Sequence, residues 1–240
     1  MKPYLTSRNR GFTLLETVIA IGVLAVLLTG FMVVFTPAAE GIRKSINVQQ
    51  ADRLASAVEQ ELVTLHQGDA KPPEIVTGFD KSYSWIKNSN NATSALMVYQ
   101  YRGELGGTSR QDGTPKPVVS LKNKLPGKDY VVIPTVRRKS DNNFKDDLSA
   151  VEGPVYLVKC TQLVFAAGEL KLGAPGAIID PKGTAASTSG ADYPEAVIAF
   201  SADFYQMPAK TWEYFSSAAF TSKFSTLKNP VFSRNLAVRR

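Results

Sequence analysis

The sequence predicts an α+β protein in which one long amino-terminal helix packs on a carboxy-terminal antiparallel β-sheet. The first observation is an apolar run of 24 residues, 12–35, followed by apolar residues at helical spacing as far as Leu65. The second is a series of short runs rich in β-branched and aromatic residues, separated by polar, glycine-containing segments. A chain of 240 residues with 44% hydrophobic residues is long enough to bury a core.

The apolar run is long enough to cross a membrane, since 24 residues form a helix of roughly 36 Å and the hydrocarbon core is about 30 Å thick. A cleaved secretory signal is one alternative, because Thr36, Ala38 and Ala39 loosely suit a signal-peptidase site. The apolar region of a secretory signal is only about 7 to 15 residues long, which is shorter than the 24-residue run of this chain. An ordinary anchor is the other alternative, but Glu16 within a span would cost about 2.5 to 3.5 kcal/mol.

Cleavage between Gly11 and Phe12 would give Glu16 a partner. The new α-amine of Phe12 would lie about one helical turn from Glu16 in the same subunit. Between staggered subunits, Glu16 of one could face Phe12 of the next. Pairing would offset part of the desolvation cost and favour assembly over an isolated span.

Residues 10–16, Arg-Gly-Phe-Thr-Leu-Leu-Glu, closely resemble the prepilin processing motif of type IV pilins and type II secretion pseudopilins. A short leader containing Lys2 and Arg8 precedes them, and the apolar helix follows. The resemblance covers about the first 65 residues. Many major pilins have a proline within the span, whereas the first proline after the motif here is Pro37, just past the apolar run.

The resemblance implies that a membrane-embedded prepilin peptidase, an aspartic protease, cuts after Gly11 on the cytoplasmic side. The same enzyme family N-methylates the new terminus, Phe12, with S-adenosylmethionine. Glu16 corresponds to the glutamate needed for subunit addition to the filament. The chain is then a substrate of this chemistry and is not itself expected to be an enzyme.

Four segments follow from these features. They are a leader at 1–11, a transmembrane and filament-core helix at 12–36, an amphipathic continuation at 37–68 and a β-rich extracytoplasmic domain at 69–240. Local melting of the helix on assembly is expected between Gly22 and Pro37, because glycine weakens a helix by about 1 kcal/mol relative to alanine. His66 is expected on the last helical turn, as a solvated cation.

The rest of the chain is predicted to be a pilin-like antiparallel sheet. Strands are expected at 95–102, 130–138, 155–172 (a hairpin turning near 167–168) and 196–205. Segments 106–117 and 180–194 are expected to be surface loops, and 68–82 a linker. Residues 220–240 are expected to form a last strand or a tail with solvated charges.

Two groups of charged residues are considered as binding sites, an acidic group for calcium and a basic group for nucleic acid. Acidic side chains gather at Asp141, Asp146, Asp147 and Glu152, but the EF-hand spacing fails because Lys145 stands where an oxygen ligand belongs. A solvated acidic loop is therefore expected in place of a calcium site. A basic set is spread over more than one element, so nucleic acid is not expected as a partner; it comprises Lys116, Lys122, Lys124, Lys128, Arg137, Arg138 and Lys139.

Composition restricts the remaining functions. Cys160 is the only cysteine and His66 the only histidine, so an intramolecular disulfide is excluded. A catalytic pair of a nucleophile and a base has almost no candidate residues for the same reason. Cys160 is expected to be a buried small hydrophobe. The net charge of +7 falls to +4 when the leader is removed, and this is not a polyanion-binding composition. No cofactor and no metal is expected.

The sequence thus predicts a minor or specialised subunit of a type IV pilus or a type II secretion pseudopilus. Its expected partners are prepilin peptidase, other pilin or pseudopilin subunits, the assembly platform with its ATPase, and membrane lipid. It is expected in the bacterial inner membrane as a single-pass protein, with a cytoplasmic amino terminus and a periplasmic, extracellular or filament-borne domain. The alternatives are a displayed binding module, such as an adhesin or a DNA or substrate receptor, and a membrane-anchored enzyme.

Overall fold

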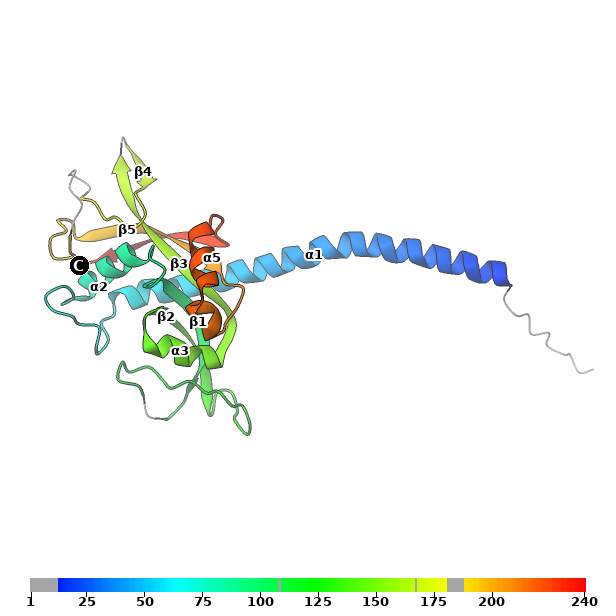
Figure 1. Ribbon diagram of the computed structural model, residues 1–240, viewed down its shortest axis with the longest axis horizontal. Coiled ribbons are helices and arrows are strands. Elements are labelled where there is room, and N and C mark those ends of the chain that lie inside the picture. Colours follow the sequence, from blue (N-terminus) through cyan, green and yellow to red (C-terminus); the bar gives the residue numbers. More distant parts are fainter. Residues whose placement is uncertain (1–12, 108, 167, 181–187) are drawn as a thin grey trace, which may run out of the picture. The chain divides into compact units, whose positions relative to one another are not determined.

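The computed structural model describes residues 13–107, 109–166, 168–180 and 188–240, and the chain divides into two units after Ile46. A single helix, α1 (Leu14–Val63), begins in the first unit and ends in the second (Figure 1). It is continuous through Pro37, as the periodicity predicts. It ends at Val63, so His66 lies past its end and the prediction that His66 is on the last turn is wrong.

The first unit is an apolar helix whose described side chains are all exposed. Three threonine hydroxyls along it donate to carbonyl oxygens four residues earlier: Thr17 to Thr13 at 3.2 Å, Thr29 to Ala25 at 2.8 Å and Thr36 to Met32 at 2.9 Å. Such internal hydrogen bonds satisfy polar groups where no water is available. In the part of the chain that the structure describes, α1 is the one helix long and apolar enough to span a membrane.

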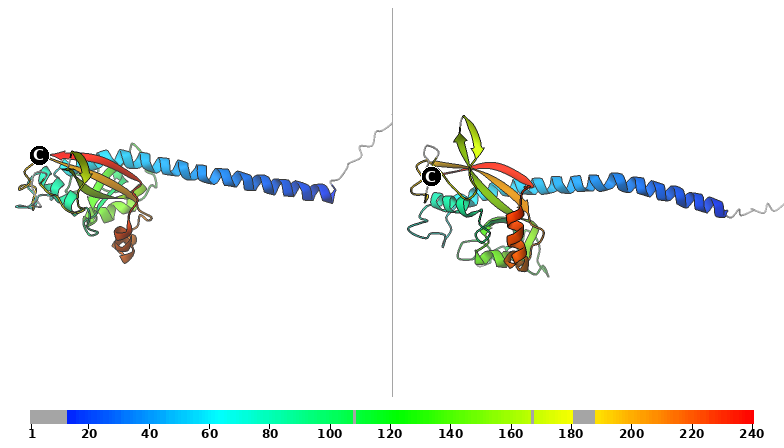
Figure 2. Two further views of the ribbon diagram at one scale, coloured as in Figure 1. Left: turned by 90° about the horizontal axis from the view of Figure 1, so that it is seen from above. Right: turned by 45° about the horizontal axis from the view of Figure 1, so that its top comes forward.

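The second unit contains an antiparallel sheet with the strand order β2-β1-β3-β5-β6. These strands are β1 (Leu96–Glu104), β2 (Tyr130–Arg138), β3 (Val151–Ala166), β5 (Val197–Gln206) and β6 (Phe232–Arg239). A short strand, β4 (Glu169–Leu172), pairs with the far end of β3 as the predicted hairpin. The α+β architecture, with a long helix packed on an antiparallel sheet, is confirmed (Figures 1 and 2).

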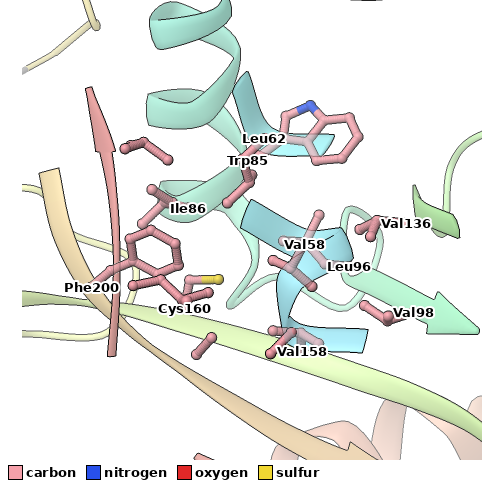
Figure 3. Close-up of a cluster of buried hydrophobic side chains, with 14 of the residues drawn as sticks. Val58, Leu62, Trp85, Ile86, Leu96, Val98, Val136, Val158, Cys160 and Phe200 are labelled. Carbon is pink, nitrogen blue, oxygen red and sulfur yellow. The ribbon is translucent and has the colours of Figure 1, made fainter. Parts of the chain in front are cut away.

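One face of the sheet packs against α1 and α2 (Gly78–Asn88). Alternate residues of a strand point to opposite faces, and the side chains of Leu96 and Val98 lie on this one. Figure 3 shows Val58 and Leu62 of α1 among the side chains of this core. The residues that α1 buries here are Ala51, Leu54, Ala55, Val58 and Leu62.

Helix α2 corrects the prediction that residues 68–82 are a linker. It begins with a capping box, in which the hydroxyl of Thr77 accepts from the backbone N–H of Asp80 at 3.2 Å. The carboxylate of Asp80 accepts from the N–H of Thr77 at 2.9 Å. The two side chains satisfy two of the free donors at the helix start, so the helix begins although Pro72 and Pro73 lie only a few residues earlier.

The other face of the sheet is covered by short helices that were not predicted. They are α3 (Asn142–Asp147), α4 (Trp212–Ser216) and α5 (Ala218–Thr226). Their aromatic rings Phe144, Phe215 and Phe220 pack in a second core with Tyr99 and Leu157 of the sheet. The expectation of a strand or tail across 220–240 is therefore wrong at 220–226, which belong to α5, and correct at 232–239, which form β6.

Candidate functional site

The residues of the predicted processing motif lie at and before the start of α1. Gly11 and Phe12, the predicted cleavage and methylation positions, lie outside the described residues. Glu16 lies in the first turn of α1 and is exposed.

Glu16 forms a capping box with Thr13. The carboxylate oxygen Oε2 of Glu16 accepts from the backbone N–H of Thr13 and from its hydroxyl, both at 2.9 Å. The hydroxyl of Thr13 in turn accepts from the backbone N–H of Glu16 at 3.2 Å. Two of the donors that every helix start leaves free are thus satisfied.

This arrangement gives Glu16 a partner before any cleavage takes place. A negative charge in the first turn also interacts favourably with the helix dipole, by about 0.3 to 1 kcal/mol at exposed positions. No described residue donates a hydrogen bond to the second oxygen, Oε1, so that oxygen is open to a further donor. The contribution of Thr13 was missed, although the spacing Thr13-x-x-Glu16 is the sequence signal for a capping box.

The helix surface that follows Glu16 has apolar and small side chains that no described residue covers. The side chains of Leu14, Val26 and Val33 are exposed by 86%, 72% and 69%. A shallow hollow on one side is lined by Ala25, Val26, Thr29, Gly30 and Val33. Small residues allow the backbones of two helices to approach closely in a membrane, so this surface is suited to lipid and to a neighbouring helix.

The acidic loop considered for calcium is not fully solvated, which corrects that expectation. Asp147 is completely buried, and its carboxylate accepts from the Tyr99 hydroxyl at 2.7 Å, Arg137 Nε at 2.8 Å and Arg110 Nη1 at 2.6 Å. Asp141 caps the start of α3 by accepting from the N–H of Asn143 at 2.8 Å. In the described chain, no three Asp, Glu, His or Cys side chains are placed to hold a metal ion.

Arg137 lies at the centre of this cluster. Its Nη1 contacts the carboxylates of Asp112 at 2.8 Å and Asp141 at 3.2 Å, and its Nη2 donates to the Thr114 hydroxyl at 2.8 Å. Burial alone would raise the pKa of Asp112, but hydrogen bonds from Thr114 and Arg137 hold that pKa well below its usual range. Burial, with the neighbouring Asp147 charge, raises the pKa of Tyr99 well above 10. The guanidinium therefore joins the long loop 105–129 to α3.

The basic set considered for a polyanion is not one surface. Arg137 is 5% exposed, and its guanidinium donors are engaged by the side chains of the buried cluster. Arg138 lies over the Trp85 ring at 5.4 Å, and Lys139 lies over the Phe220 ring at 4.6 Å. The lysines at 116, 122, 124 and 128 belong to the loop at the opposite end of β2. Charge reversal at Arg137 would therefore test folding and not ligand binding.

A second buried charge, Lys81 on α2, was also missed. Its Nζ lies 2.8 Å from Glu61 Oε1 and 2.8 Å from Asp69 Oδ2, and it donates to the carbonyl of Thr64 at 2.6 Å. His66 lies beside the same group, with Nε2 3.1 Å from Glu61 Oε2. These contacts satisfy a carbonyl just past α1 and fix the end of α1 against α2.

Cys160 is buried in the core, as predicted, and burial raises the pKa of its thiol to about 12. Its backbone N–H donates to the Ser89 hydroxyl at 2.8 Å, and its carbonyl accepts from Asn90 Nδ2 at 2.7 Å. A thiol with this pKa is almost entirely protonated at neutral pH and is a poor nucleophile.

Comparison with known families identifies one match. Residues 6–32 match the model described as the prokaryotic N-terminal methylation motif. The match includes Gly11, Phe12, Glu16 and most of the apolar run, as far as residue 32. No curated protein and no solved structure matches the chain significantly.

Proposed function

Because the chain carries at residues 6–32 the prepilin motif of type IV pilins and pseudopilins, we propose that it is a structural subunit of a filament of this type. The observation that carries the proposal is that residues 14–36 of α1 are all exposed and apolar or uncharged except for one carboxylate, Glu16, in the first turn. Prepilin peptidase would cut after Gly11 and methylate Phe12, and the helix would then leave the membrane to join other subunits.

Glu16 would guide subunit addition through the new α-amine of Phe12. One oxygen of Glu16 already accepts two hydrogen bonds from Thr13, at 2.9 Å each. The other oxygen is open to a donor from the same subunit or from the next one. A charge-assisted hydrogen bond is roughly twice as strong as a neutral one, so the amine would be the strongest partner that cleavage could provide.

The subunit would be a minor or specialised one. Removal of 11 residues from 240 leaves a mature chain of 229, which is larger than expected of a bulk subunit. The sheet with helices on both faces would be displayed outside the inner membrane, and the amino terminus would begin in the cytoplasm. Assembly energy would come from an external ATPase acting through a platform protein, and no catalytic role is assigned to the chain itself.

The test is mass spectrometry of the amino-terminal peptide, combined with filament incorporation of four chains. Wild type should begin at N-methylated Phe12. Glu16→Ala should be processed but not incorporated, whereas Glu40→Ala, which removes another exposed carboxylate of α1, should be processed and incorporated. Thr13→Ala should retain incorporation if Glu16 acts through the amine.

Two results would overturn the proposal. Retention of Met1, or cleavage near Ala38, would mean an ordinary anchor or a secreted protein. If Thr13→Ala lost incorporation as completely as Glu16→Ala, the role of Glu16 would be that of a helix cap and the amine pairing would be wrong.

A further inference from the structure

The hairpin of β3 and β4 extends beyond the rest of the sheet and has one apolar face. Pairing between β3 and β5 ends at Gln162, and the hairpin continues with the pairs Leu163–Leu172 and Phe165–Leu170. Residues directly opposite each other, and residues two apart, share a face of a hairpin. Its four apolar side chains, Leu163, Phe165, Leu170 and Leu172, therefore lie on the same side, which we call the hairpin face.

Most of the hairpin face is exposed, and Leu163, next to the end of the β3–β5 pairing, is half-buried. Phe165, Leu170 and Leu172 are exposed by 67%, 54% and 61%. The opposite side of the hairpin carries an ion pair, with Lys171 Nζ 3.2 Å from Glu169 Oε2, beside the smaller apolar side chains of Val164 and Ala166. An exposed group of large apolar side chains with polar surroundings is typical of a binding surface.

A second apolar surface lies at the other end of the sheet. β1 ends at Glu104, close to the start of β3, and the loop 105–129 returns the chain to β2. Four side chains of this loop are exposed by 41% to 60%. We call these four side chains the loop patch: Leu105, Val119, Leu121 and Leu125.

Hydrogen bonds fix the loop patch in place. The backbone N–H of Leu105 donates to the carbonyl of Asp129 at 3.0 Å, and the N–H of Leu125 donates to Asp129 Oδ2 at 2.7 Å. The N–H of Lys124 donates to the carbonyl of Leu121 at 3.1 Å. The patch is thus part of a folded loop.

The two surfaces are far apart and at opposite ends of β3. The 16 residues of β3 span roughly 50 Å at about 3.3 Å per residue. Figure 1 shows the β4 hairpin at the top of the second unit and the loop 105–129 at its base. One chain cannot bring its own hairpin face to its own loop patch.

Charge at the two ends is complementary. Arg110 and Asp112 of the loop 105–129 are paired in the buried cluster, so the charges that this loop presents at the surface are those of four lysines, Lys116, Lys122, Lys124 and Lys128, against Asp129. The described residues 169–180 and 188–195 include four acidic residues, Glu169, Asp180, Asp192 and Glu195, against one basic residue, Lys171. The chain around Ile179 and Tyr193 lies beside the base of the hairpin, because Gln162 Nε2 donates to the carbonyl of Ile179 at 2.8 Å and to the Tyr193 hydroxyl at 3.3 Å. The carbonyl of Gln162 also accepts from the backbone N–H of Gly173 at 2.8 Å.

We infer that the hairpin face of one copy docks on the loop patch of the next copy of the same chain. Contact between two different surfaces of identical chains is heterologous, and when its rotation does not close it produces an open helical assembly. Such a contact suits a filament, so the inference rests on the proposed function and names a lateral interface for it. The contact requires only that copies of the same specialised subunit are neighbours in the filament.

The test is disulfide cross-linking of the full chain in membranes. Leu170→Cys and Leu125→Cys together should give, on oxidation, a ladder of dimers, trimers and larger products that a reductant removes. Each single variant should remain monomeric, and the two single variants expressed together should stop at the dimer. Wild type is the blank, because its only cysteine, Cys160, is buried.

The matched control replaces the neighbouring residue on the other side of the hairpin. Lys171→Cys with Leu125→Cys should give no ladder, although Lys171 is also exposed. The inference is overturned by an equal ladder from Lys171→Cys, by a dimer from Leu170→Cys alone, or by a product whose mass is not a multiple of the chain. A processed chain that begins at Phe12 and gives only monomers overturns this contact alone, whereas retention of Met1 overturns the filament role as well.

Discussion

The substitution Asp147→Asn tests the buried charge cluster directly. It keeps the shape of the side chain and one carbonyl oxygen, so the Tyr99 hydroxyl can still donate to it. It removes the negative charge that faces Arg137 Nε at 2.8 Å and Arg110 Nη1 at 2.6 Å. Arg137 keeps Asp112 and Asp141 as partners, but Arg110 loses its ion pair, and its buried Nη2 already has no hydrogen-bond partner among the described residues.

The expected loss of stability is about 3 kcal/mol. Removing one partner of a buried ion pair costs about 3 to 5 kcal/mol because the other charge is left uncompensated. The two remaining carboxylates around Arg137 place the value at the low end. Domains are stable by about 5 to 15 kcal/mol in total, so the variant should fold and be measurably weaker.

Urea unfolding of the full chain in detergent measures this change through tryptophan fluorescence. Both tryptophans, Trp85 and Trp212, lie in the second unit and pack near its two cores. With a slope of about 2 kcal/mol per molar urea, the midpoint should fall by about 1.5 M. Asp146→Asn is the control, because its side chain is exposed and the midpoint should stay within about 0.3 M of wild type.

Equal midpoints for wild type, Asp147→Asn and Asp146→Asn would refute the reasoning. The buried carboxylate would then contribute no net stability, and the loop 105–129 would be held by its other contacts. A lower slope with an unchanged midpoint would point instead to a change in the unfolded or native ensemble.

Three further predictions concern other buried groups. Lys81→Met should lower the free energy of unfolding by about 3 kcal/mol, measured in the same urea titration, because Glu61 and Asp69 lose a buried cation; an unchanged midpoint would contradict this. The lowered pKa of Asp112 means that its stabilisation is present above about pH 4 and is lost as the pH falls below that value, so Asp112→Asn should lose less stability than wild type between pH 5 and 3; parallel pH profiles would count against it. Cys160 should react with a maleimide at pH 7 only after unfolding, because its thiol is buried and has a pKa of about 12; labelling of the folded chain would show that the site opens.

The regular strands could be predicted from sequence because each has a strong local signal. Alternating apolar residues and bounding turns placed a strand at 130–138, where β2 lies, and one at 95–102, where β1 spans Leu96–Glu104. The hairpin of β3 and β4 was also predicted, with its turn near residue 168. The continuity of α1 followed from apolar spacing that persists past Pro37.

The short helices could not be predicted with the same success because tertiary contacts stabilise them. Helices α3 and α4 have only 6 and 5 residues, and isolated helices of this length are unstable in water. They exist here because Phe144 and Phe215 pack at 5.1 Å between ring centroids in the second core. Helix α2 had a readable signal, the capping spacing Thr77-x-x-Asp80, which the preceding prolines obscured.

The main error of prediction at the candidate sites was to miss the buried charges. The reason is that the partners of a buried charge are far from it along the chain. Asp147 pairs with Tyr99, 48 residues away, and with Arg110, 37 residues away. Read from sequence alone, Asp147 belongs to a polar stretch and is expected in solvent, since unpaired aspartate is almost never buried. Only the fold shows that guanidinium groups from two other segments converge on it.

Glu16 shows the opposite case, in which local sequence contained more than was first inferred. The cost of a carboxylate in an apolar segment raised the question of its partner, and an α-amine after cleavage was one answer. Thr13 is a second partner that needs no cleavage, and both answers use the same carboxylate. In the proposed function the cap would hold the side chain of Glu16 in a fixed orientation at the helix start. The amine created by processing would therefore meet a carboxylate that has already lost most of its conformational freedom, which lowers the entropic cost of pairing.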